Sequence, residues 1–140
     1  MTSKNDFEYG ESLVKKWIRT VNTHKVSSVM SLYRLDNCIL IPTVSNTIFA
    51  NENIKEYFNV FLRKKDLKGK LIDIMVQIAC ASDRASYICS GYYEFSFKEK
   101  IKNKYVKKVV VARFSYVFEY CRKHKKYHII NHHSSLLPEN

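Results

Sequence analysis

The sequence is poor in the residues that build flexible turns: it contains 3 glycines and 2 prolines among 140 residues. Nicotinamide- and flavin-binding folds need a glycine-rich turn between a strand and a helix, and the sequence has none. No apolar run approaches the roughly 20 residues that cross a bilayer, and the polar start has no secretory apolar region. These absences favour a cofactor-free cytoplasmic protein that does not enter a membrane.

The four cysteines form no close pair, and their spacing is not typical of a metal site. Cys38, Cys80, Cys89 and Cys121 each lie apart from the others, inside apolar segments. We interpret them as buried, reduced thiols. The sequence therefore predicts neither disulfides nor a metal centre.

Acidic residues are few, with 13 Asp and Glu against 24 Lys and Arg, for a net charge of +11. The basic residues of this basic protein gather in three segments, at residues 63–70, 98–108 and 122–126. Each segment falls between expected elements, so we interpret all three as solvated loops. The alternative is a nucleic-acid or anionic-surface binder, which requires the three segments to converge on one face.

The hydrophobic residues make up 46% of the chain and show two periodicities. Helical spacing at residues 11–21, 26–33 and 54–62 predicts three amphipathic helices. From Lys70 onward the pattern alternates, which predicts long strands at residues 70–80, 85–97, 105–121 and 127–137. A short strand at residues 36–44 is confined to an edge or a bend by Pro42. The expected fold is one α+β domain over residues 1–140, with N-terminal helices packed on a curved antiparallel sheet.

Both faces of this expected sheet are apolar. Phe114 and Phe118 lie on one face, whereas Met75 and Val109 lie on the other. The helices suffice for one face only, so the other face requires a partner. We interpret the many aromatic residues as core or interface rather than as base-stacking residues. Gly91, inside a strand, indicates a bulge or the close approach of another backbone or of a ligand.

Two stretches at the end of the chain carry a specific resemblance. "ARFSYVFEY" at residues 112–120 and "HHSSLLPE" at residues 132–139 resemble the carboxy-terminal signature of SnoaL-like proteins, in particular SgcJ/EcaC-type proteins and the association domain of calcium/calmodulin-dependent protein kinase II. The resemblance implies the cone-shaped fold of the nuclear-transport-factor-two-like superfamily. It also implies a homodimer in which two copies pack sheet to sheet.

The last strand turns polar at Asn131, and its two adjacent histidines must point to opposite faces. His133 shares a face with Asn131 and Ser135, while Arg113 interrupts an apolar alternation on a neighbouring strand. A charge there is costly unless it is paired or meets a ligand. These four residues, with Tyr93 opposite, are the predicted site for a small anionic ligand.

Alternatives to this site remain open. If the faces are reversed, His132 and Ser134 take the places of His133 and Ser135. Both histidines could instead be hydrogen-bonded residues of the sheet, and Arg113 could pair with Glu94, Glu119 or an acidic residue of a second copy.

Two functional interpretations follow from the resemblance. The first is a non-catalytic, homo-oligomerising module with a ligand-binding pocket. The second is a cofactor-independent isomerase, dehydratase or cyclase that uses His133 as general base and Arg113 to hold an anionic substrate. In ketosteroid-isomerase-like enzymes a catalytic carboxylate precedes a proline at the end of the first strand. Ile41 holds that position here, before Pro42, and an isoleucine side chain accepts no proton.

Overall fold

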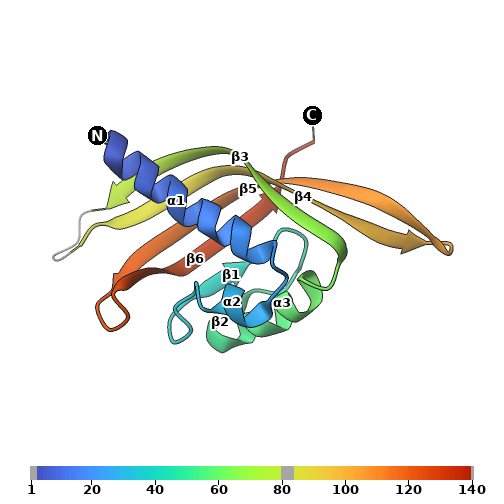
Figure 1. Ribbon diagram of the computed structural model, residues 1–140, viewed down its shortest axis with the longest axis horizontal. Coiled ribbons are helices and arrows are strands. Elements are labelled where there is room, and N and C mark those ends of the chain that lie inside the picture. The colour runs from blue at the N-terminus through green and yellow to red at the C-terminus, as the bar shows by residue number, and fades with distance from the viewer. Residues whose placement is uncertain (1–2, 80–83, 140) are drawn as a thin grey trace.

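The computed structural model describes residues 3–79 and 84–139. Cys80 and most of the connection between the strands expected at residues 70–80 and 85–97 therefore lie outside the described residues. In chain order the elements are α1 (Lys4–Val21), α2 (Val26–Met30), β1 (Ile39–Ile41), β2 (Phe49–Ala50), a 3₁₀ turn (Asn51–Asn53), α3 (Ile54–Phe61), β3 (Lys65–Ala79), β4 (Ser86–Ile101), β5 (Lys104–Cys121) and β6 (Lys126–Leu136). The helices lie on one side of a curved sheet (Figure 1). No helix in the described ranges is long and apolar enough to span a membrane.

The sheet has six strands in the order β2-β1-β6-β5-β4-β3. Strands β3 to β6 form the expected antiparallel meander. β1 is the exception, since it runs parallel to β6 and pairs Leu40 with His132. A parallel pair needs a long connection, which the whole meander supplies. The sheet is therefore mixed rather than wholly antiparallel.

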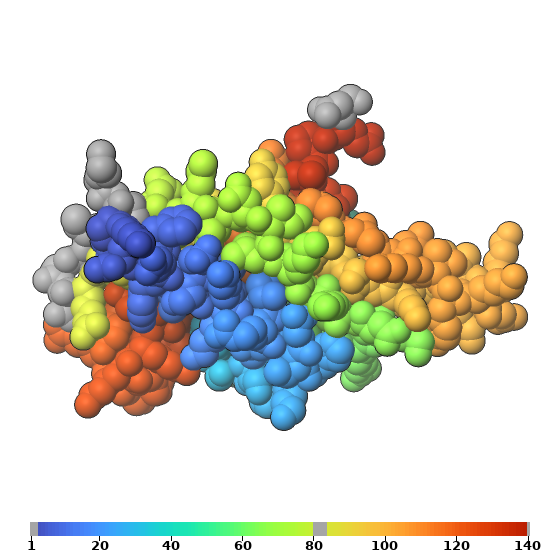
Figure 2. Space-filling view, turned by 45° about the horizontal axis from the view of Figure 1, so that its top comes forward, coloured from blue at the N-terminus to red at the C-terminus, as the bar shows by residue number. Residues whose placement is uncertain are grey.

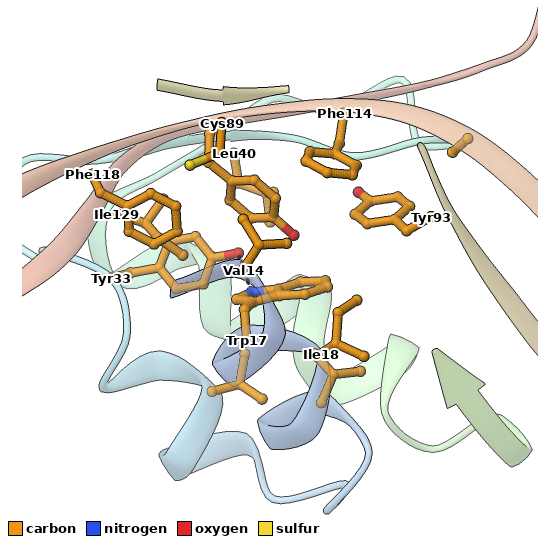
Figure 3. Packing of buried hydrophobic residues seen from close by; sticks show 14 of the residues in the cluster. Val14, Trp17, Ile18, Tyr33, Leu40, Cys89, Tyr93, Phe114, Phe118 and Ile129 are labelled. Atoms are coloured by element: carbon orange, nitrogen blue, oxygen red, sulfur yellow. Dashed lines mark hydrogen bonds between the residues drawn. The ribbon is translucent and has the colours of Figure 1, made fainter. Parts of the chain in front are cut away.

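Helix α1 begins at Lys4, earlier than the apolar periodicity predicts, because Ser3 caps it. The Ser3 side chain accepts a hydrogen bond from the backbone N–H of Asp6 at 3.1 Å, which satisfies one of the free donors of the first turn. Val14, Trp17 and Ile18 form the buried stripe of this helix. Figure 3 shows these side chains meeting Cys89, Tyr93 and Phe114 of the sheet. This layer of side chains is the core.

The alternation of β3 is interrupted by a bulge, which the structure places between Leu71 and Asp73. As a result Ile74 and Val76 are buried, whereas Ile72 is 48% exposed. Opposite the bulge, a Cβ atom added at Gly91 would lie 2.0 Å from the backbone oxygen of Asp73. The close backbone approach predicted at Gly91 is confirmed.

The sequence predicted a loop for the basic segment at residues 98–108. The structure shows a two-stranded arm instead. β3 pairs with β4 only as far as Lys98, and β6 pairs with β5 only as far as Ala112. Beyond these points β4 and β5 pair with each other alone and turn at Lys102 and Asn103, which have φ values of 50° and 66°. Positive φ at both central residues is the geometry of a tight hairpin turn. The arm projects from the body of the molecule (Figures 1 and 2).

The three basic segments do not converge on one face. Residues 63–70 lie beside the arm, since Lys65 pairs with Lys98. Residues 122–126 comprise the turn between β5 and β6 and the first residue of β6, at the opposite end of the sheet (Figure 1). A binder of nucleic acid or of an anionic surface that uses all three segments needs them on one face. One chain does not bring them together in this way.

Candidate functional site

Strand β6 sends its two histidines to opposite sides of the sheet, as predicted. His132 is 2% exposed and faces the helices together with Ser134, which is 4% exposed. His133 is exposed on the other side, which none of the described helices covers and which we call the open face. A bulge at Ile130, which has no partner in β5, shifts the alternation between Ile129 and Asn131. His132 and Ser134, the two residues named in the alternative assignment of faces, are therefore the ones that point toward the core.

The predicted site residues are divided between the two sides of the sheet. Arg113, Asn131, His133 and Ser135 lie together on the open face, with Arg113 paired to Ser135 across β5 and β6. Tyr93 is 2% exposed and points the other way, into the core. The five residues consequently do not line one cavity within the chain. The four on the open face remain a predicted polar patch.

The buried side of β6 is built around His132, whose two ring nitrogens both have partners. Tyr33 Oη lies 2.8 Å from His132 Nδ1, and Tyr93 Oη lies 3.1 Å from His132 Nε2. Trp17 Nε1–H donates to the Tyr33 hydroxyl oxygen at 3.0 Å. The Tyr116 ring stacks on the imidazole with centroids 4.0 Å apart. This network, which we call the His132 cluster, joins α1, the segment after α2, β4, β5 and β6.

The electrostatics of the His132 cluster suit a structural role. Burial, with the neighbouring His133 as a second cause, lowers the pKa of His132 to about 3. Burial also raises the pKa values of the Tyr33, Tyr93 and Tyr116 hydroxyls. The imidazole is therefore neutral at neutral pH, with one nitrogen donating and the other accepting. A base with so low a pKa is poorly matched to proton abstraction.

The His132 cluster should make the protein sensitive to acid. The unfolded chain takes up a proton at this imidazole below pH 6.5, whereas the folded chain resists protonation down to about pH 3. The contribution of His132 to stability is thus fully present above pH 6.5 and is lost as the pH falls toward 3. Between pH 7 and pH 5 we expect a loss of about 2 kcal/mol from this group.

Urea unfolding of the natural protein and of His132→Gln, each at pH 7 and pH 5, measures this loss. Glutamine can donate and accept hydrogen bonds but does not titrate, so the variant should lose about 2 kcal/mol less than the natural protein over the same interval. Equal losses would contradict the assignment, because all other titrating groups are common to both proteins.

A hollow of about 330 Å³ lies between α3 and the sheet. Its wall is mostly apolar, with Tyr57 and Phe61 from α3 facing Phe95 of β4, and Glu56 and Lys64 supply the charges. Thr43 also lines it and hydrogen-bonds Ser134 through the two hydroxyl oxygens, 2.5 Å apart. The volume is at the small end of the range for ligand pockets. The sequence predicted a ligand-binding pocket, but none of the five residues predicted for it lines this hollow. The lining could not be predicted because it comes from segments far apart in the chain.

The helices on one side of a curved mixed sheet, with a hollow between α3 and the strands, define the nuclear-transport-factor-two-like class of α+β cone. The family model for the calcium/calmodulin dependent protein kinase II association domain matches residues 11–138. The chain belongs to this family, which confirms the resemblance drawn from "ARFSYVFEY" and "HHSSLLPE".

Solved structures agree with this family assignment. A Xanthomonas campestris protein with the same association-domain description is 36% identical, with a TM-score of 0.77, over 93% of this chain and 86% of that one. A nuclear-transport-factor-two-like superfamily protein from Salmonella enterica has a TM-score of 0.73 at 13% identity, over 95% and 91% of the two chains. A ketosteroid isomerase-like protein from Erwinia carotovora has a TM-score of 0.66 at 9% identity, over 98% and 100%. The last two show the fold alone. The sequence matches no curated protein.

Proposed function

We propose that this chain is a non-catalytic module that associates with a second copy of itself through the open face of its sheet. Membership of an association-domain family supports self-association. The observation that carries the proposal is the open face itself, which the helices leave uncovered (Figure 1). Its apolar side chains include Met75, 74% exposed, Val109, 53% exposed, and Tyr92, 41% exposed. Exposed apolar patches of this kind mark interaction sites.

The charges of the open face support a symmetric pair. Arg113 and Glu94 both lie on it, since Arg113 pairs with Tyr92 and Glu94 follows two residues later on the same side of β4. Neither side chain forms an ion pair with another of the described residues. In a two-fold interface, residue i of one copy meets residue j of the other and the reverse. An Arg113–Glu94 contact between copies would therefore form twice.

The proposed small-ligand site is the hollow beside α3 rather than the open face. The hollow is enclosed by a helix, a loop and strands, and its lining offers Lys64 to an anionic group. The polar patch around Arg113 and His133 is instead covered by the second copy in the proposed dimer. In this arrangement Arg113 meets an acidic residue of that copy, one of the alternatives left open by the sequence.

The geometry gives less support to a catalytic function. His132 is buried and already has partners at both ring nitrogens. His133, the general base of the enzymatic alternative, lies on the open face and not in the hollow beside α3. The ketosteroid isomerase-like neighbour shows the fold alone. In this chain Ile41, which cannot accept a proton, precedes Pro42.

Sedimentation equilibrium tests the proposed self-association. One chain has a mass of 16.6 kDa, so we expect a species of at least twice that mass at micromolar concentration. Dissociation on dilution would give the affinity directly. A mass of one chain at every concentration up to the solubility limit would contradict the proposal.

A further inference from the structure

The turn between β5 and β6 brings together three side chains that commonly bind metals. Cys121 ends β5, His124 lies in the turn, and His128 lies on β6. Glu119 pairs with His128, and directly paired residues share a face. Cys121 follows Glu119 by two residues on β5, so Cys121 and His128 lie on the same face of this hairpin. One ligand atom from each of Cys121, His124 and His128 lies within 4.8 Å of the other two.

The separation of Cys121 and His124 already fits a tetrahedral zinc ion. Zinc binds cysteine sulfur at about 2.3 Å and histidine nitrogen at about 2.0–2.1 Å, so a tetrahedral site separates sulfur from nitrogen by about 3.5 Å. Cys121 Sγ and His124 Nδ1 are 3.4 Å apart. The rings of His124 and His128 meet edge to face, with centroids 5.4 Å apart. Because His124 is exposed in the turn, its side chain can move to bring the three ligand atoms, which lie within 4.8 Å of one another, around one ion.

His128 supplies an independent sign that a ligand is expected here. The side chain is only 6% exposed, and its Nδ1 atom is buried with no hydrogen-bond partner among the described residues. A buried polar atom without a partner is costly and needs an explanation. A metal ion bound by this nitrogen provides one.

We propose that Cys121, His124 and His128 bind a zinc ion at the end of the β5–β6 hairpin. Thiolate and imidazole ligands suit zinc and exclude magnesium and calcium, which prefer oxygen. The three residues line a hollow of about 470 Å³, so the fourth position of the ion opens to solvent and can hold a water molecule. The sequence predicted no metal site because the spacing of the four cysteines is not typical of one, and these three ligands come together only where the hairpin turns.

Arg34, Lys123 and Lys126 line this hollow, and among the described residues Arg34 alone of the three forms ion pairs. Arg34 lines the same hollow but forms ion pairs with Asp36 at 3.1 Å and Glu119 at 3.0 Å. Lys126 donates from Nζ to the backbone oxygen of Ser31 at 3.3 Å. The Cys121 thiolate offsets one of the two charges of the ion. Zinc binding must release the thiol proton, so affinity should fall in acid.

The test measures zinc bound by the reduced, full-length protein after dialysis against micromolar Zn²⁺. We expect one zinc per chain, no retention of Mg²⁺, and a sulfur-to-metal charge-transfer band when Co²⁺ replaces zinc. Cys121→Ser should abolish this band, and Cys121→Ser and His124→Ala should each weaken zinc binding at least tenfold. Both positions lie at the surface end of the hairpin, so circular dichroism should show both variants folded.

His24→Asn is the matched control, since it removes a histidine that lies near the start of β3 and hydrogen-bonds the Leu67 oxygen. It should bind zinc as the natural protein does. Failure of the natural protein to retain zinc would overturn the proposal. So would zinc binding by Cys121→Ser and His124→Ala that is as tight as that of the natural protein. The site lies within one hairpin, so either result is independent of self-association.

Discussion

Replacing Met75 and Val109 with lysine is expected to convert the assembled protein into monomers. The side chains of both residues are more than half exposed in the single chain, at 74% and 53%, and contribute nothing to its core. In a two-fold interface each substitution occurs twice, so the proposed contact would bury four positive charges facing apolar surface. We expect the dissociation constant to rise at least about a hundredfold, which corresponds to about 2.7 kcal/mol. Sedimentation equilibrium measures the change.

Val106→Lys is the matched control for this double variant. Val106 lies on β5, like Val109, and is 42% exposed. It precedes Val109 by three positions, and residues at odd offsets along a strand point to opposite faces, so its side chain lies on the other face of the sheet. The control should assemble as the natural protein does, with the same unfolding temperature. If the double variant stayed assembled, or the control dissociated equally, the contact would lie elsewhere.

Gly91→Ala is expected to destabilise the chain by about 4 kcal/mol or more, a large share of the stability of an ordinary domain. An alanine in a strand normally stabilises relative to glycine. Here the added Cβ would lie 2.0 Å from the Asp73 oxygen and 2.9 Å from the Ile74 Cα. Both are backbone atoms, so relief requires β3 to move away from β4 or the bulge of β3 to shift.

Urea unfolding followed by tryptophan fluorescence measures this effect, because Trp17 lies in the core against the Tyr93 ring. Ser96→Ala, on the same strand, is the control. Ser96 is half-buried and makes no side-chain hydrogen bond with the described residues. Loss of its hydroxyl should therefore change the free energy of unfolding by less than about 0.5 kcal/mol. A similarly small effect of Gly91→Ala would show that the two strands are not in close contact at this point.

The sequence predicted the meander well because alternation is a local property. Phe114 and Met75 lie on the faces that their alternation predicted, and the helices cover the face that holds Phe114. The arm at residues 98–108 was missed because its lysines have the composition of a loop, although strands can be polar on both sides where nothing packs on them. The early start of α1 was missed because the apolar pattern begins after the cap at Ser3.

The candidate site was harder to predict because it depends on long-range pairing. Alternation separates His132 from His133 but does not say which one faces the helices. That choice is made by the bulge at Ile130 and by the parallel pairing of β1. The hollow beside α3 and the Cys121–His124–His128 cluster both combine segments whose proximity is a consequence of the fold.

Hydroxyl-radical footprinting of the natural protein beside the Met75→Lys/Val109→Lys variant tests the central claim most directly. Tyr92 lies on the open face and is 41% exposed in the single chain, while Tyr9 on α1 is 45% exposed. If two copies pair through the open face, Tyr92 should be modified several times more slowly in the natural protein than in the variant, with Tyr9 modified equally in both. Equal modification of Tyr92 in an assembled natural protein would show that the chain associates through another surface.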